Sequence, residues 1–178
     1  MSDSKGYKGW RDTDRMIRHA KALQEVAEHV ALRQDDDPDP FEDLFIGKPL
    51  AHPILLALAT EIVLKALCCR ERKGPPDHGH DMVELFDALS EDIRGRLQAR
   101  LPVQPDPFGA HLVQPFGAGM RKVLEFHRDT FETWRYLYEQ TSIRTWPPQL
   151  DEALTAIIET YNDPTLPRPA LEGLEAAP

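Results

Sequence analysis

The stretch from Ile54 to Leu89, ILLALATEIVLKALCCRERKGPPDHGHDMVELFDAL, decides the fold. Its first half repeats apolar residues at helical spacing, and so does the short run after Asp81, which predicts two helices. Between them, residues 73–79 are rich in Gly and Pro, which predicts a loop. Asp81 stands directly before the second apolar run, at the position of a helix N-cap. The stretch therefore predicts two helices joined by a Gly/Pro loop that ends at His80-Asp81.

Comparable patterns on both sides of this stretch predict further helices. The first is expected from Asp12 or Thr13 to about Gln34, because its apolar residues recur at steps of three and four. The others are expected as a short turn at 41–45, a long helix from His52-Pro53 to about Glu71, short helices at 82–89 and 90–101, a long helix at 118–140 and a last helix at 147–161.

These helices predict an all-α fold, an up-and-down bundle of four main helices plus short ones. The 178 residues fit one domain, and the sixteen prolines cluster between the predicted helices. We expect a flexible arm at residues 1–11, a helical domain at 12–162 and a disordered tail at 163–178. The tail is acidic and rich in Pro and Ala, a composition with little to bury.

Composition argues against several classes of protein. The net charge of −9 is opposite to that of most proteins that grip a nucleic-acid backbone non-specifically. The two cysteines, Cys68 and Cys69, are adjacent, so they predict neither a disulfide framework nor a metal site. No cofactor motif is apparent. The N-terminus has no apolar signal region, and we expect no run approaching the roughly 20 apolar residues of a membrane span. The prediction is a cytoplasmic protein with no membrane partner.

Charged residues form two regular patterns on the predicted helices. Glu61 and Lys65 are four residues apart, in the favourable order for an intrahelical pair. On the 118–140 segment, Arg121, Arg128 and Arg135 each precede a glutamate by four residues, which is the weaker order. This arginine series is either a solvated face or a surface that contacts another helix or subunit, and the weak local order favours contacts outside the helix.

Three blocks of sequence resemble the HEPN superfamily: EIVLKAL at 61–67, GHDMVELFDAL at 79–89, and the pattern F-x-x-W-R-Y-x-Y-E at 131–139. The resemblance covers the middle of the chain. It implies an up-and-down helical bundle, usually a homodimer, with a connection to RNA. Many members are metal-independent RNases of toxin–antitoxin, phage-defence or CRISPR-associated systems. Others are catalytically silent partners of nucleotidyltransferases.

The polar residues of these blocks form a candidate network, which comprises Glu61, Lys65, His80, Asp81, Arg135, Tyr136 and Glu139. One hypothesis is a structural network that fixes the helix register. Another is a cleft that binds a nucleotide or an RNA phosphate through Arg135, Lys65 and His80. The remaining alternative is that these residues do not meet.

The catalytic members of the superfamily carry an Arg-x4-6-His motif, and Arg121 with His127 matches it. The resemblance implies that neutral His127 takes the 2′-hydroxyl proton of RNA while Arg121 stabilises the phosphorane. However, so short a motif also arises by chance in a chain with seven histidines, and residues six apart on one helix point about 120° apart. His127 is then a core or interface histidine. Arg72 and His78 also match, but in the Gly/Pro loop.

The sequence thus predicts a HEPN-like nucleotide- or RNA-associated protein, non-catalytic or weakly catalytic, in a toxin–antitoxin or defence system. The expected partners are a second copy of the chain, a nucleotide or RNA ligand, and a cognate antitoxin or nucleotidyltransferase. One alternative is a metal-independent endoribonuclease that uses Arg121 and His127. A second is a purely structural dimerisation module.

Overall fold

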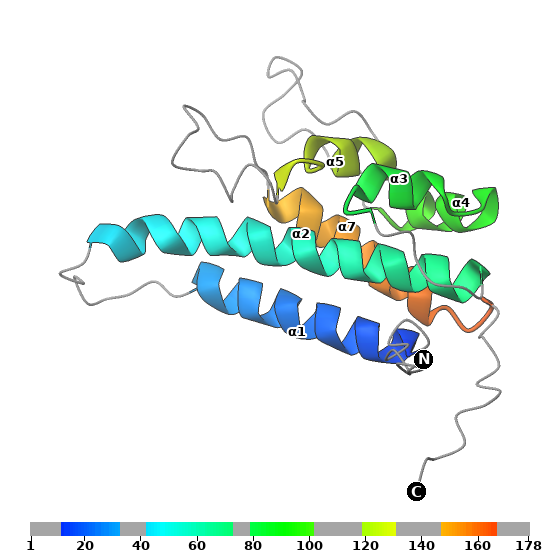
Figure 1. Cartoon of the computed structure of the whole chain (residues 1–178), viewed down its shortest axis with the longest axis horizontal. Coiled ribbons are helices and arrows are strands. Elements are labelled where there is room, and N and C mark those ends of the chain that lie inside the picture. Colours follow the sequence, from blue (N-terminus) through cyan, green and yellow to red (C-terminus); the bar gives the residue numbers. More distant parts are fainter. Residues whose placement is uncertain (1–11, 33–41, 73–78, 102–118, 131–146, 167–178) are drawn as a thin grey trace, which may run out of the picture.

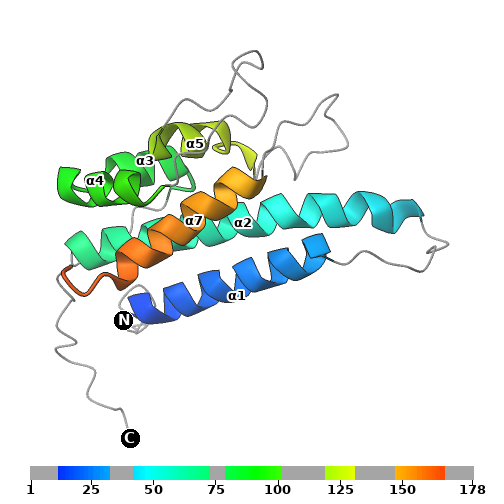
Figure 2. The same ribbon diagram turned by 180° about the vertical axis from the view of Figure 1, so that it is seen from behind.

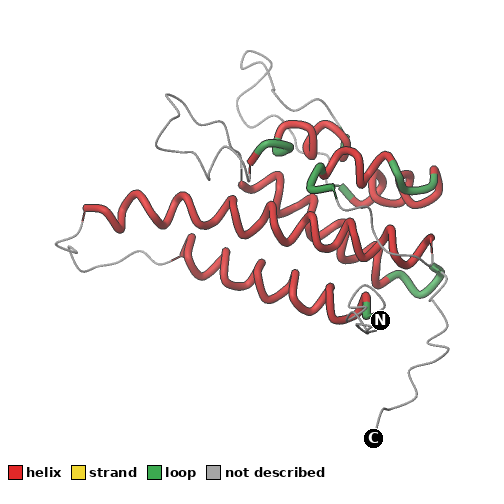
Figure 3. Tube along the Cα trace, viewed as in Figure 1, coloured by secondary structure: helices red, strands yellow, loops and turns green. Residues whose placement is uncertain are grey.

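The computed structural model describes residues 12–32, 42–72, 79–101, 119–130 and 147–166. Within these ranges the chain is all-α: it has helices and no strand (Figure 3). The all-α prediction is confirmed. The described helices are α1 (Thr13–Leu32), α2 (Glu42–Arg72), α3 (Met82–Asp87), α4 (Glu91–Arg100), α5 (Met120–Phe126) and α7 (Pro147–Asn162).

Helix α2 is the centre of the structure. It contacts α1 along one side and α7 along another, and α1 runs antiparallel to it (Figure 1). The short helices α3, α4 and α5 lie together on the far side of α2 and α7 from α1, as the view from behind also shows (Figure 2). Helix α3 packs on α2 and α5, while α4 packs on α7. Helices α2 and α7 therefore lie between α1 on one side and the three short helices on the other.

The core runs along α2. Leu56, Leu64 and Leu67 of this helix are fully buried, and they meet fully buried leucines of α4, α5 and α7 in one cluster. By length and composition alone, residues 51–72 could also cross a membrane, which corrects the expectation that no run in the chain would. A core helix passes the same test, and 61% of the most apolar window is buried inside the protein. Here α2 is a core helix.

Four helices begin and end close to their predicted positions, and the capping residues explain two of them. The Asp81 carboxylate accepts hydrogen bonds from the backbone amides of Val83 and Glu84, which begins α3. The Ser90 hydroxyl accepts from the amide of Ile93, which begins α4. Both caps satisfy amides that have no partner within the helix.

The predicted start of the second helix is wrong. Helix α2 begins at Glu42 and continues through Gly47, Pro49 and Pro53, where the sequence predicted a turn, a break and a start. A proline inside a helix removes one backbone hydrogen bond and costs about 3 kcal/mol relative to alanine. The buried Pro53 and the residues after it pack against the neighbouring helices, and this tertiary packing offsets the local penalty.

The predicted continuous helix from 118 to 140 is also wrong. Helix α5 ends at Phe126, and residues 127–129 form turns. The backbone amides of Arg128 and Thr130 bond three residues back, at 3.3 and 3.0 Å, so the chain tightens there. Residues 127–130, HRDT, include neither Gly nor Pro, so nothing in the sequence predicted an interruption of the helix there. The remaining part of that predicted helix, residues 131–140, lies outside the described residues.

Residues 163–166, which were assigned to the disordered tail, pack on the body of the protein. Asp163 accepts from Arg100 at 2.6 Å and from Arg96 at 3.4 Å, and Leu166 is buried. Residues 1–11, which were predicted to be a flexible arm, and residues 167–178, the rest of the predicted tail, lie outside the described residues, as do residues 102–118.

A buried arginine that the sequence did not reveal joins three helices. Arg70, near the end of α2, donates to the carbonyl oxygen of Tyr161 and, over 2.8 Å, to that of Leu166. Its guanidinium also lies over the Tyr161 ring, 4.9 Å from the centroid. The Tyr161 hydroxyl in turn donates to the Asp14 carboxylate over 2.8 Å and lies 2.6 Å from the Thr13 hydroxyl, both at the start of α1. Burial is the largest of the effects that raise the pKa of Tyr161 to about 12.

Candidate functional site

Three of the predicted site residues meet at a single carboxylate. Glu61 Oε1 accepts from Lys65 Nζ over 2.7 Å and lies 3.0 Å from His80 Nδ1. The first contact lies within α2, and the second joins α2 to the residue that precedes the α3 cap. The Glu61 and Lys65 side chains are only 12% and 16% exposed, whereas His80 is 79% exposed. The Glu61 carboxylate is thus held by Lys65 in the half-buried part of the site, and the exposed imidazole of His80 contacts the same oxygen at the surface.

The carboxylate defines the chemistry of this imidazole. An ionised carboxylate only accepts hydrogen bonds, so Nδ1 of His80 must carry the hydrogen in the contact with Glu61. In the neutral ring, Nε2 is then the nitrogen with the lone pair. A base held in one tautomer by a third group is the arrangement found in nucleophile-activating dyads and triads. Because most of the ring is exposed, this base is open to a ligand.

Asp81, the residue after His80, joins this site to the turn that follows α5. Besides capping α3, it accepts from Arg128 Nε over 2.6 Å, and Nη2 of the same guanidinium contacts the same oxygen. Burial alone raises the pKa of Asp81, but the hydrogen bonds from Arg128, Val83 and Glu84 outweigh it and hold the pKa below its ordinary value. We call Glu61, Lys65, His80, Asp81 and Arg128 the α2–α3 corner.

The residues that match the catalytic motif point apart. Arg121 faces outward and pairs with Asp87 of α3 through Nε at 3.0 Å and Nη2 at 3.0 Å, and these bonds raise its pKa. His127 follows α5 directly and is fully buried, with its ring edge-on to Phe126 at a centroid distance of 5.0 Å. Within one chain, Arg121 and His127 therefore do not form a shared site.

Arg128 is the member of the corner that the sequence did not assign to it. It appeared only as one of three regularly spaced arginines. Both described members of that series bind carboxylates at the ends of α3: Arg128 binds its N-cap Asp81, and Arg121 binds Asp87 and also lies 3.7 Å from Glu125, four residues on. The weak Arg-before-Glu order was the available signal, and it favoured contacts outside the helix.

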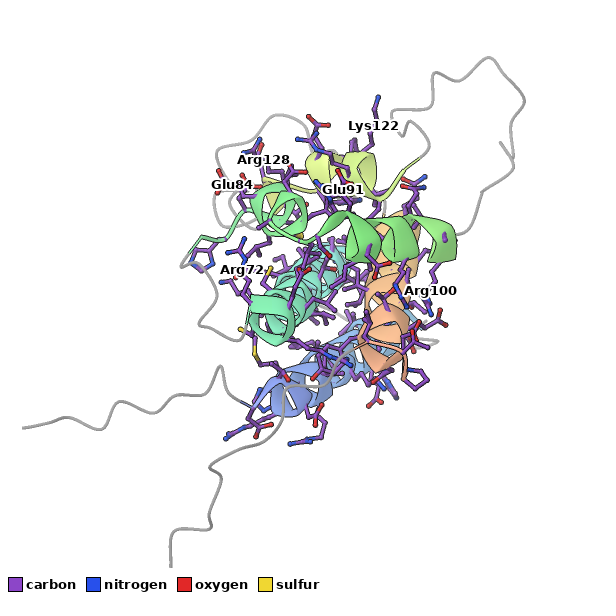
Figure 4. All side chains as sticks on the ribbon, turned by 90° about the vertical axis from the view of Figure 1, so that its right-hand side faces the viewer. Arg72, Glu84, Glu91, Arg100, Lys122 and Arg128 are labelled. Atoms are coloured by element: carbon purple, nitrogen blue, oxygen red, sulfur yellow. The ribbon has the colours of Figure 1, made fainter. Side chains whose placement is uncertain are left out.

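Other candidates fall away from the corner or outside the described ranges. Arg135, Tyr136 and Glu139 lie in the segment 131–146, outside the described residues, and so does His78. Arg72 is exposed near the end of α2 and donates to the carbonyl oxygen of Ala88 over 3.0 Å. Viewed from the end of the bundle, Arg72 and Arg128 are on the same side of the molecule, whereas Arg100 is on the opposite side (Figure 4).

The corner carries carboxylates and cations in nearly equal number. Lys65 lies on Glu61, and Arg128 lies on Asp81, so each cation is already paired. Among the residues that the structure describes, no group of three or more His, Cys, Asp and Glu side chains is placed to hold a metal ion. The chemistry that the corner offers is therefore hydrogen bonding and proton transfer at the exposed His80, and hydrogen bonding at the exposed Arg128.

Comparison of the chain with protein-family models, with curated proteins and with solved structures gave no match.

Proposed function

We propose that this chain is a HEPN-like helical module that associates with a nucleotide or RNA and does not use Arg121 and His127 for catalysis. The observation that carries the proposal is the separation of these two residues. A general base must reach the proton that it abstracts, and His127 is fully buried. The guanidinium of Arg121 is paired with Asp87 at the surface, whereas the ring of His127 is buried, so the two do not act on one group.

The α2–α3 corner is the binding surface in this proposal. His80 and Arg128 present exposed groups that hydrogen-bond to ligands, and both are held in place by carboxylates. The guanidinium of Arg128 has five N–H groups, of which two are used on Asp81, so others remain for a phosphate or a base edge. The net charge of −9 favours a small or single-stranded ligand held locally over a duplex held by charge.

The remaining parts of the proposal come from the resemblance of the three sequence blocks. They are a homodimer and a role beside a cognate antitoxin or nucleotidyltransferase in a toxin–antitoxin or defence system; the proposed cytoplasmic location comes instead from the two adjacent cysteines, which predict no disulfide framework. Light scattering after gel filtration tests the dimer. A dimer with no affinity for nucleotides or RNA would favour the purely structural dimerisation module.

A thermal-unfolding screen tests ligand binding. A ligand bound only by the folded form raises the midpoint, so we expect an increase with particular nucleotides or with short single-stranded RNA. The increase should disappear in Arg128→Ala and persist in Arg18→Ala, which removes an exposed arginine from α1. No shift with any ligand, or an equal shift in Arg128→Ala, would contradict the proposed surface.

A further inference from the structure

Resting on the homodimer of the proposed function, we propose that the outward face of α1 is the surface through which two copies of the chain pair. In this pair the two α1 helices are antiparallel, and a twofold axis passes beside Ala22. The three sequence blocks that resemble the HEPN superfamily do not include α1, so the resemblance does not supply this surface. The surface follows instead from the position of α1 and from the order of its charges.

Helix α1 lies at the edge of the molecule. It packs on α2, and the short helices lie on the far side of α2 and α7 from it (Figure 1, Figure 2). Ile17, Ala20 and Ala27 of α1 are buried in the core. On the opposite side of the helix, Ala22 is exposed and Val26 is 51% exposed. The small side chain of Ala22 lets a second helix approach closely, because the distance between packed helices depends on the side chains at the contact.

Beyond its first turn, the exposed charges of α1 are separated along the helix. Arg18 and Lys21 come first, and Glu25 and Glu28 follow. Lys21 precedes Glu25 by four residues, which is the weaker order for an intrahelical pair. Within the part of the chain that the structure describes, none of these four side chains forms an ion pair. The two ends of this face therefore carry opposite charges that the chain itself does not compensate.

A twofold axis beside Ala22 brings these opposite charges together. Arg18 precedes Ala22 by four residues and Glu25 follows it by three, which is about 6 Å and about 4.5 Å along the helix. Both side chains lie on the same side of Ala22, about 40° and about 60° around the helix. An antiparallel second copy therefore places its Glu25 beside Arg18, and symmetry forms the same pair a second time. On the other side of Ala22, Val26 of one copy meets His19 of the other.

This contact predicts a weak dimer that is sensitive to salt. Helix α1 has 20 residues and is about 30 Å long, so one pair of such helices falls at the small end of protein interfaces, where transient complexes lie. Ion pairs between exposed side chains are screened by salt. We therefore expect the dissociation constant to rise about tenfold between about 0.05 M and about 0.5 M NaCl.

Sedimentation equilibrium of the full chain tests the surface through an exchange of charges. Arg18→Glu and Glu25→Arg should each be monomeric at concentrations where the wild type is a dimer, because each variant places like charges together twice. A mixture of these two variants should form a heterodimer, since both contacts then join opposite charges. The double variant Arg18→Glu/Glu25→Arg should dimerise like the wild type for the same reason.

Lys122→Glu is the matched control. It makes the same change of charge at an exposed position of α5, on the other side of the protein from α1 (Figure 4), and should leave the dissociation constant unchanged. Circular dichroism checks that each variant is folded. A dimer that persists in Arg18→Glu, or a mixture of the two single variants that stays monomeric, would overturn the inference and leave the proposed homodimer to another surface. A wild-type chain that is monomeric at every concentration would remove both.

Discussion

Arg128 donates from Nε to Oδ2 of Asp81 over 2.6 Å, and this bond joins the turn after α5 to the N-cap of α3 across 47 positions of sequence. Asp81 therefore has two roles, since the same carboxylate caps α3. The chain leaves the helical path at residues 127–129, where this arginine reaches the cap. The corner where His80 stands is held together by this relationship.

The double role of Asp81 predicts different costs for two substitutions. Asp81→Ala removes both the cap and the ion pair, and loss of the cap alone should lower the free energy of unfolding by about 0.5–2 kcal/mol. Asp81→Asn keeps a capping oxygen and loses only the charge, so it should be milder. Urea unfolding followed by circular dichroism measures both. Equal losses in the two variants would show that the cap contributes nothing.

The acid sensitivity of the fold should follow Asp81 and Asp163. Hydrogen bonds from Thr165, followed by those from Arg100, lower the pKa of Asp163, and the net effect of its partners also lowers the pKa of Asp81. A carboxylate with a lower pKa in the folded state stabilises the protein above the unfolded-state value and loses that contribution as the pH falls through the folded value.

Stability should therefore fall as the pH drops below about 4, the ordinary value for aspartate. Urea midpoints measured from pH 6 to pH 2 check this. Asp163→Asn should flatten the acid limb, whereas Glu159→Gln, at an exposed position of α7, should leave it as in the wild type. An acid limb that is unchanged in Asp163→Asn would count against the role given to this residue.

Arg70 should be among the most sensitive polar positions. Arg70→Met removes two charge-assisted hydrogen bonds to carbonyl oxygens and leaves those oxygens buried, which should cost about 3 kcal/mol or more. Arg70→Lys should recover only part of the loss, because a single ammonium does not reproduce the planar fork. Guanidinium chloride unfolding measures the difference. If methionine and lysine were both neutral, the assigned link between α2 and α7 would be wrong.

The two thiols should be slow to react in the folded protein. Both cysteines are buried, and burial is the main cause that raises the pKa of Cys69 to about 11. At pH 8 the thiolate fraction of Cys69 should be about a hundredfold lower than that of a free cysteine. A colorimetric disulfide reagent should therefore react slowly with native protein and rapidly with two thiols in urea. Rapid reaction of a native thiol, traced with Cys69→Ala, would contradict the burial of this position.

Local signals were sufficient for the helices whose ends depend on nearby residues. Asp81 and Ser90 cap the amides two or three positions ahead, so both starts could be read from the sequence. Local signals were insufficient where packing between residues far apart in the sequence determines the helix ends. Gly47 and Pro49 predicted a break and His52-Pro53 a new start, but α2 continues through all of them because packing offsets the local penalty. Residues 127–129 were predicted to be helical, but they form a tightened turn in which Arg128 binds Asp81.

The candidate site shows the same division. Glu61 and Lys65 are four residues apart on one helix, and His80 directly precedes the predicted cap of the next helix, so these contacts could be proposed from the sequence. Arg128 was not, because its partner is far away in the sequence. Arg70 left no pattern either, since it donates to backbone carbonyl oxygens 91 and 96 residues away, and any residue type supplies those.

The protonation state of His80 tests the central claim most directly. Long-range proton–nitrogen NMR spectra at a pH where the ring is neutral report which ring nitrogen carries the hydrogen, and His80→Gln assigns the signal. The structure predicts hydrogen on Nδ1 and a free lone pair on Nε2, with this preference lost in Glu61→Ala. Hydrogen on Nε2 in the wild type, or identical spectra in wild type and Glu61→Ala, would contradict it.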